Sequence, residues 1–98
     1  MKPEKSPLEK LPNIGKKLAN ELKVIGVHTP GQLRKLGPVA CYVRLSIEHS
    51  PRRLPHCYYL FSLQAAVQGR HWRHLAAETK QELVQKARDQ LGRTAFRV

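Results

Sequence analysis

Apolar residues recur along this chain at the spacing of short amphipathic helices. The clearest run has steps of four, four and three residues and comprises Ile14, Leu18, Leu22 and Ile25. This period predicts a helix over about 15–25 with one buried face. No run alternates apolar and polar residues next to turn residues at hairpin spacing. We therefore predict an all-α fold, a compact bundle of about five to six helices.

Two helix-start signals mark the beginnings of short predicted helices. Segment 6–9, SPLE, is a capping box with proline at the first helical position, and it predicts a helix over about 7–11. Segment 29–32, TPGQ, repeats the signal and predicts a helix over about 30–36. The first two predicted helices and the loop between them have the form of a helix-hairpin-helix unit.

Three longer helical patterns follow in the second half of the chain. They predict helices over about 38–49, 55–69 and 77–91. The face expected to be buried on the first of these comprises Val39, Val43, Ser46 and Ile47. The second is apolar around most of its circumference, so we expect it to be central and covered on several sides. The glycines expected to end helices are Gly26, Gly37, Gly69 and Gly92.

The chain is strongly basic for its length. Its 98 residues include 18 Lys and Arg against 7 Asp and Glu, which gives a formal net charge of +11 and a pI of about 10.3. Such an excess favours a polyanionic partner, nucleic acid before an acidic membrane surface. The alternative is a basic domain with no such partner. The length fits a single domain over residues 1–98, with an ordered core expected over about 6–92.

Cysteine usage and the apolar stretches indicate a cytoplasmic protein. Cys41 and Cys57 lie in predicted helices and have no CxxC spacing, so reduced thiols are the simplest interpretation. The first ten residues lack the apolar core of a secretion signal. The most apolar stretch, 57–67, is too short to span a bilayer. We expect no membrane contact.

The candidate binding site is the loop between the first two predicted helices. Asn13, Ile14 and Gly15 form the turn, and Lys16 and Lys17 open the next helix. Free N–H groups and the positive end of the helix dipole attract phosphate at such a position. Asn13 stands where the usual hairpin has its first glycine, and asparagine tolerates the left-handed conformation. Phosphate binding and simple helix packing, with Ile14 as a core plug, both remain open.

Further basic residues extend the candidate surface. Arg34 and Lys35 lie on the short third helix, Arg44 on the next one, and Arg52 and Arg53 in the loop after it. If these side chains share a face with the hairpin, they track phosphates; otherwise they form a solvated shell. Few aromatic residues lie among them, which disfavours stacking on single strands.

No catalytic or metal-binding pattern emerges from the sequence. The seven acidic residues are dispersed, whereas a metal-dependent nuclease needs clustered carboxylates. His71 and His74 do not form a closed zinc set with His56 and Cys57. Trp72 is interpreted as a core anchor. We expect neither enzymatic activity nor a cofactor.

The residues discussed so far resemble the C-terminal domain of the TfoX/Sxy competence regulators. The resemblance covers about 8–91; its most specific parts are the pattern NIG…L…GV.T..QL..LG over 13–37 and the pair Gly69 and Trp72. It implies an all-helical domain with a helix-hairpin-helix-like unit. In the full-length regulators this domain follows an N-terminal α/β domain, and the two promote expression of DNA-uptake genes. Here we expect the C-terminal domain without that first domain.

Two functions follow as alternatives. The first is a regulatory module, linked to competence or transcription, that binds DNA backbone phosphates with little sequence specificity. The second is a protein-interaction module that forms a weak homodimer or docks on the transcription machinery. The broadly apolar helix over 55–69 motivates the second, since one of its sides would pair with a partner if it stayed uncovered.

Overall fold

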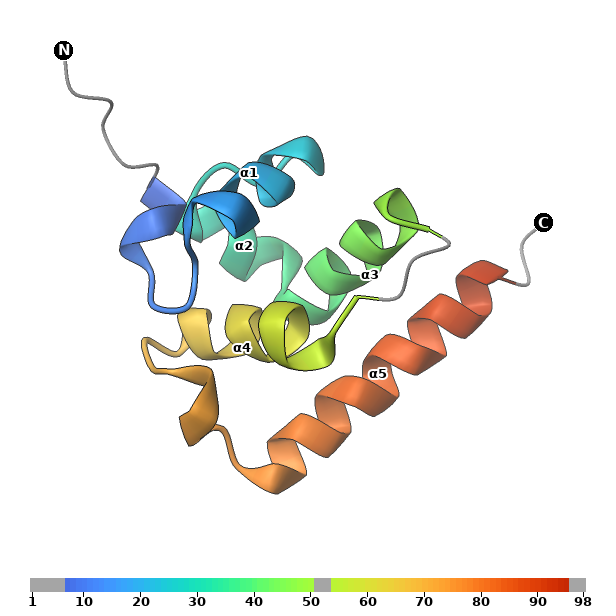
Figure 1. Cartoon of the computed structure of the whole chain (residues 1–98). Helices are drawn as coiled ribbons and strands as arrows, with labels where there is room; N and C mark the ends of the chain where they lie inside the picture. Colours follow the sequence, from blue (N-terminus) through green and yellow to red (C-terminus); the bar gives the residue numbers. More distant parts are fainter. Residues whose placement is uncertain (1–6, 51–53, 96–98) are drawn as a thin grey trace, which may run out of the picture.

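The computed structural model is an all-helical bundle (Figure 1). It describes residues 7–50 and 54–95, without the side chains of Cys57 and of residues 93–95. These residues contain no strand, which confirms the all-α prediction, and none of their helices is long and apolar enough to cross a membrane. In chain order the elements are η1 (Pro7–Lys10), α1 (Lys16–Val24), α2 (Pro30–Leu36), α3 (Pro38–Glu48), η2 (His56–Phe61), α4 (Ser62–Val67), η3 (Trp72–His74) and α5 (Ala77–Ala95).

The first predicted helix is a single 3₁₀ turn, η1. The backbone N–H of Leu11 donates to the carbonyl of Leu8 at 3.0 Å, and Pro12 then prevents continuation into an α-helix. The side chain of Leu8 is fully buried, so this short turn still anchors the hairpin to the core. The predicted capping serine, Ser6, lies outside the described residues.

Helix α1 ends at a glycine, as predicted. Gly26 has φ +87°, and its N–H donates to the carbonyl of Lys23 at 3.0 Å. The N–H of Val27 donates to the carbonyl of Leu22 at 2.9 Å. This pair of bonds is a Schellman motif, and the buried side chains of Leu22 and Val27 supply its apolar contact.

Helix α2 begins and ends where the sequence predicts. The Thr29 hydroxyl accepts a hydrogen bond from the N–H of Gln32 at 3.1 Å and caps the helix. The Gln32 side chain accepts in turn from the N–H of His28 at 2.7 Å, one residue further out than in the usual capping box. Gly37, with φ +92°, separates α2 from α3.

Helix α3 lies at the centre of the bundle and packs against α1, α2, α4 and α5. Its buried side chains are Cys41, Tyr42, Val43 and Leu45. The predicted face was therefore only partly right: Val43 is buried, but Ile47 is 49% exposed. A helix covered from more than one side buries residues on more than one face, which a single-face pattern does not capture.

The predicted helix over 55–69 is present but begins as a π-helix. The π-helical turn η2 continues directly into α4, and Gly69, with φ +72°, follows its end as predicted. Its buried side chains include Tyr59, Leu60, Leu63, Ala65 and Ala66. The helix is thus covered, as expected for a central element. Among its described side chains Tyr58 is 39% exposed and Phe61 and Val67 are half-buried, and the protein-interaction module stays a prediction.

Helix α5 forms one side of the bundle, drawn in orange to red in Figure 1. Leu83 and Ala87 are buried and Val84 and Leu91 are half-buried, which confirms the predicted face. The prediction that Gly92 ends this helix was wrong, because α5 continues to Ala95. Gly92 does not adopt a positive φ, so it is an interior residue and not a cap.

Candidate nucleic-acid interface

The hairpin loop has the backbone that the sequence predicts. Asn13 adopts φ +70° and is the one non-glycine residue with positive φ in the part of the chain that the structure describes. Ile14 is buried in the core, so its side chain contributes to helix packing. Gly15 is exposed, and a Cβ built on it would meet nothing within 4 Å. The protein therefore leaves open space beside the backbone of Gly15.

The Asn13 side chain joins the hairpin to a distant segment. Its Nδ2 donates to the carbonyl of Arg70 at 2.8 Å, and its Oδ1 accepts from the backbone N–H of Trp72 at 3.2 Å. Both ends of the amide are therefore engaged within the protein. Asn13 therefore fixes the loop to the segment that contains Arg70 and Trp72.

The N-terminus of α1 is electrostatically unusual. Gly15 supplies no side-chain cap, and the first turn contains no acidic residue. Lys16 and Lys17 occupy this turn and are exposed. Cations near a helix N-terminus are unfavourable because the dipole places about half a positive charge there. An anion bound at this point would relieve that repulsion.

Aromatic residues lie next to the hairpin, contrary to the impression given by the sequence. A hollow of about 410 Å³, called the aromatic pocket from here on, is lined by Asn13, Tyr58, Ser62, His71 and Trp72. The Lys17 Nζ lies 5.7 Å from the centre of the Tyr58 ring. Sequence reasoning missed this site because Tyr58 and Trp72 come from separate elements, and no local pattern brings them to the hairpin.

The Tyr58 hydroxyl stays protonated at neutral pH. Burial, and then the negative charge of Glu21, raise the pKa of Tyr58 above its ordinary value. The side chain is nevertheless 39% exposed. Tyr58 therefore presents a neutral ring and a hydrogen-bond donor at the surface.

The other predicted binding residues lie elsewhere. Arg34 and Lys35 are exposed on α2, and Lys35 lines a second hollow of about 340 Å³ with Arg44 and Gly26. Gly26 follows the C-terminus of α1, whereas Lys16 starts it, and nine helical residues span about 12 Å. Lys35 and Arg44 thus form a second basic group, separate from the hairpin lysines. Arg52 and Arg53 lie outside the described residues.

Neither a thiol nor a histidine cluster suggests catalysis. Burial raises the pKa of the Cys41 thiol to about 11, although Arg44 lowers it slightly, so the reactive thiolate is disfavoured. His28 is exposed. Across residues 7–50 and 54–95, no three His, Cys, Asp or Glu side chains gather in a way that would hold a metal ion.

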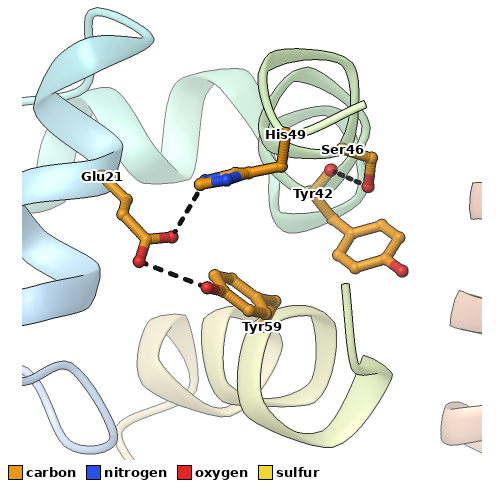
Figure 2. Close-up of polar contacts among 5 residues, drawn as sticks. All are labelled: Glu21, Tyr42, Ser46, His49 and Tyr59. Atoms are coloured by element: carbon orange, nitrogen blue, oxygen red, sulfur yellow. Dashed lines mark hydrogen bonds and ion pairs between the residues drawn. The ribbon is translucent and has the colours of Figure 1, made fainter. Parts of the chain in front are cut away.

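A polar cluster joins α1, η2 and the residue that follows α3 (Figure 2). The Tyr59 hydroxyl donates to Glu21 Oε1 at 3.2 Å, and His49 Nε2 lies 3.4 Å from Glu21 Oε2. Glu21 Oε2 is buried and accepts no hydrogen bond, so its contact is an ion pair when His49 is protonated. Figure 2 shows Glu21 of α1 pointing between His49, which follows α3, and Tyr59 of η2. This cluster orients α1 in the bundle.

Comparison with known proteins identifies the family. The TfoX C-terminal domain matches this chain over residues 4–87, almost its whole length. The chain belongs to the TfoX C-terminal domain family. No curated protein matches it. In this TfoX C-terminal domain the segment predicted to be the hairpin comprises the 3₁₀ turn η1, the loop after it and α1.

Two solved structures share the fold of this TfoX C-terminal domain. The triclinic crystal structure of an uncharacterized protein from Listeria monocytogenes has a TM-score of 0.74 and 33% identity, over 87% of this chain and 93% of that one. The tetragonal structure of a protein of unknown function from the same organism has a TM-score of 0.72 and 32% identity, over 83% and 96% of the two chains.

Proposed function

We propose that this TfoX C-terminal domain is a non-enzymatic regulatory module that binds the phosphates of nucleic acid at its hairpin. One observation carries the proposal: α1 begins with two exposed lysines, no acidic residue and no capping side chain. These groups leave N–H donors, a positive dipole and mobile cations together at one exposed point. A backbone phosphate satisfies all three.

The charge of the whole chain supports the same function. A formal net charge of +11 attracts polyanions over several ångströms and speeds their encounter. The second basic group, Lys35 and Arg44, adds cations about one helix length from the hairpin. Such contacts position a nucleic acid without reading its sequence. In the family this binding would contribute to regulation of DNA-uptake genes.

A salt titration of duplex DNA binding tests the proposal. Fluorescence anisotropy of a labelled duplex is followed between about 0.05 and 0.5 M salt, because each neutralised phosphate adds about 0.9 to the log–log slope. The double variant Lys16→Glu, Lys17→Glu should bind at least about tenfold more weakly, with a slope lower by about two.

A matched control separates the hairpin from net charge. Lys86→Glu with Arg88→Glu makes the same change in charge on the exposed side of α5. This control should lose markedly less affinity than the hairpin variant and keep its slope. Equal losses in the two variants, or no binding of duplex at low salt, would contradict the proposal.

A weak homodimer is the second candidate function, and exposed apolar side chains favour it. Val24 on α1 is 71% exposed and Ile47 on α3 is 49% exposed. Arg44 and Glu48 flank Ile47, and the three line one hollow with Ile25. In a two-fold pairing of α3 helices, Arg44 would face Glu48 of the second copy, which makes this surface self-complementary.

Salt dependence distinguishes the two functions. The net charge of +11 repels a second copy, so self-association should strengthen as salt increases, whereas phosphate binding should weaken. Sedimentation velocity is measured at about 0.1 and 0.5 M salt. The parent protein should be a dimer at the higher salt concentration, and the Ile47→Lys variant should be a monomer there. A monomer at every protein concentration and both salt levels would exclude this candidate.

A further inference from the structure

The aromatic pocket beside the hairpin has the chemistry of a nucleobase site. Three of its lining residues carry rings, Tyr58, His71 and Trp72, and Asn13 of the hairpin forms its edge. We propose that this pocket holds an unstacked base of a single-stranded nucleic acid whose phosphate lies at the hairpin. The inference rests on the proposed function and adds a ligand class to it: single strands in preference to duplex.

The rings are arranged as walls that a base can contact. The ring centres of His71 and Trp72 are 5.7 Å apart, and their planes differ by 30°. Tyr58 meets the edge of Tyr59 at 4.7 Å in a T-shaped pair. The volume of about 410 Å³ falls within the range of small-molecule sites, about 300–1,000 Å³. A planar, partly polar ligand fits such a hollow better than an aliphatic one does.

Tyr58 is held in place by an uncommon backbone. It belongs to the π-helical turn η2, and π-helical turns are rare and frequently occur at functional sites. On the opposite wall, Asn13 holds the backbone of Arg70 and Trp72 through its two hydrogen bonds. The same bonds brace the hairpin, so they join the proposed phosphate site to the Trp72 side of the pocket.

Three cations lie close to rings of the pocket. The Lys17 Nζ is 5.7 Å from the Tyr58 ring centre, and the Arg73 guanidinium is 5.9 Å from that of Trp72. Lys80 Nζ lies 5.6 Å from the Trp72 ring centre. Lys17 is exposed and occupies the position that a base would take on Tyr58. When nucleic acid binds, Lys17 moves from the ring to the phosphate and the base replaces it.

His71 offers a hydrogen bond to the base. Its Nδ1 accepts from the backbone N–H of Arg73 at 3.2 Å. The neutral ring therefore carries its proton on Nε2, which is a donor. Every base presents acceptors on its edge, so this donor aids binding without selecting a sequence. A paired base in a duplex cannot enter the pocket, because its faces are stacked on neighbouring bases and its edge is hydrogen-bonded to the opposite strand.

Binding of matched oligonucleotides tests the inference. Anisotropy titrations at one salt concentration compare dT and rU strands of about 20 nucleotides, a duplex of equal length and an abasic strand with the same phosphates. The base-containing strands should bind more tightly than the duplex and the abasic strand. The dT and rU arms show whether DNA or RNA is preferred.

Substitution of Tyr58 locates the effect. Tyr58→Ala should weaken binding of the dT strand about 5- to 150-fold, the range for loss of one stacked base. It should leave duplex and abasic binding unchanged, and Tyr58→Phe, which keeps the ring, should retain the affinity. Trp72 is the one tryptophan of the chain, so its fluorescence should be quenched by dT and not by the abasic strand.

The outcomes separate this inference from the proposed function. If dT and the abasic strand bind equally and Tyr58→Ala affects neither, the pocket holds no base, while phosphate binding at the hairpin stands. If none of the four ligands binds at low salt, both proposals fail. Circular dichroism of Tyr58→Ala shows whether this variant remains folded. His71→Ala, at a second exposed residue of the pocket, is measured in the same way.

Discussion

At the scale of single residues, Asn13 combines two structural roles in one side chain. It adopts a left-handed backbone, φ +70°, that most residues avoid. Its amide also donates to the carbonyl of Arg70 and accepts from the N–H of Trp72. Glycine would fill the first role and not the second. This is a physical reason for asparagine at a position where related hairpins have glycine.

Substitutions at Asn13 should separate these two roles. Asn13→Gly loses both hydrogen bonds but keeps the turn, and should lower the free energy of unfolding by about 1–2 kcal/mol. Asn13→Ala also strains the backbone, at a further cost of about 1 kcal/mol. Urea denaturation should therefore order the variants as asparagine, glycine, alanine. A glycine variant as stable as the parent would show that the hydrogen bonds contribute nothing.

The buried thiol of Cys41 should make stability depend on alkaline pH. Burial raises its pKa from 9.0 to about 11, so above pH 9 the unfolded chain releases a proton that the folded chain retains. Stability from this group is complete below pH 9 and is lost as the pH rises to 11. The loss should be on the order of 1–3 kcal/mol.

The Cys41→Ala variant separates the contribution of this thiol to stability from that of other groups that titrate at alkaline pH. The free energy of unfolding is measured by urea between pH 8 and 11 for the parent and for Cys41→Ala. The variant should show the shallower fall with pH, whatever its stability at neutral pH. Parallel curves would mean that Cys41 ionises equally in the folded and unfolded chains.

At the scale of secondary-structure elements, local sequence signals predicted the helix ends correctly where the residues that form the cap lie within a few positions of each other. The bounds of α2 follow from Thr29, Pro30 and Gly37, whose effects are confined to one turn. The same reasoning failed at Gly92, where α5 continues for another three residues. A glycine allows a left-handed cap but does not require one, and nothing local at Gly92 stops the helix.

Replacement of Gly92 tests its interior position directly. Gly92→Ala should raise the free energy of unfolding, by up to about 1 kcal/mol, because alanine loses less backbone entropy in a helix. Apart from its chain neighbours and the adjacent backbone of its own helix, the added Cβ meets no described atom within 4 Å. Thermal denaturation provides the measurement. Gly26→Ala should instead lower the stability, because φ +87° at that position disfavours alanine. A destabilised Gly92→Ala would indicate a cap.

At the scale of the whole molecule, sequence reasoning predicted the class and the hairpin but not the surroundings of the site. The placement of Tyr58 beside Lys17 depends on how η2 packs near α1, and no period or motif encodes that distance. For the same reason the exposure of Ile47 was missed: the faces of α3 are decided by helices on more than one side. Tertiary packing sets these features.

The Glu21 cluster should contribute measurably to the stability of the bundle. Glu21→Ala removes the acceptor for Tyr59 and the partner of His49, and should lower the free energy of unfolding by about 1–3 kcal/mol. Glu21→Gln keeps an acceptor oxygen and should lose less. Glu48→Ala, an exposed acid on α3, is the matched control and should change stability by less than about 0.5 kcal/mol.

Two results would contradict or narrow this role of the Glu21 cluster. If Glu21→Ala and Glu48→Ala have equal effects in urea denaturation, the contacts of Glu21 add nothing beyond surface charge. If Glu21→Gln is as damaging as Glu21→Ala, the ionic contact with His49, and not the hydrogen bond from Tyr59, accounts for the stability.

The Asn13 amide also has a consequence for synthesis of the protein. It bonds to residues 57 and 59 positions further along the chain. During translation the hairpin lysines therefore leave the ribosome well before the segment that braces their loop. Such distant pairing forms late, because the intervening chain must first be brought together. A nascent chain thus carries the positive charge of the hairpin before it has the fixed turn or the ring walls, and only the completed fold unites them.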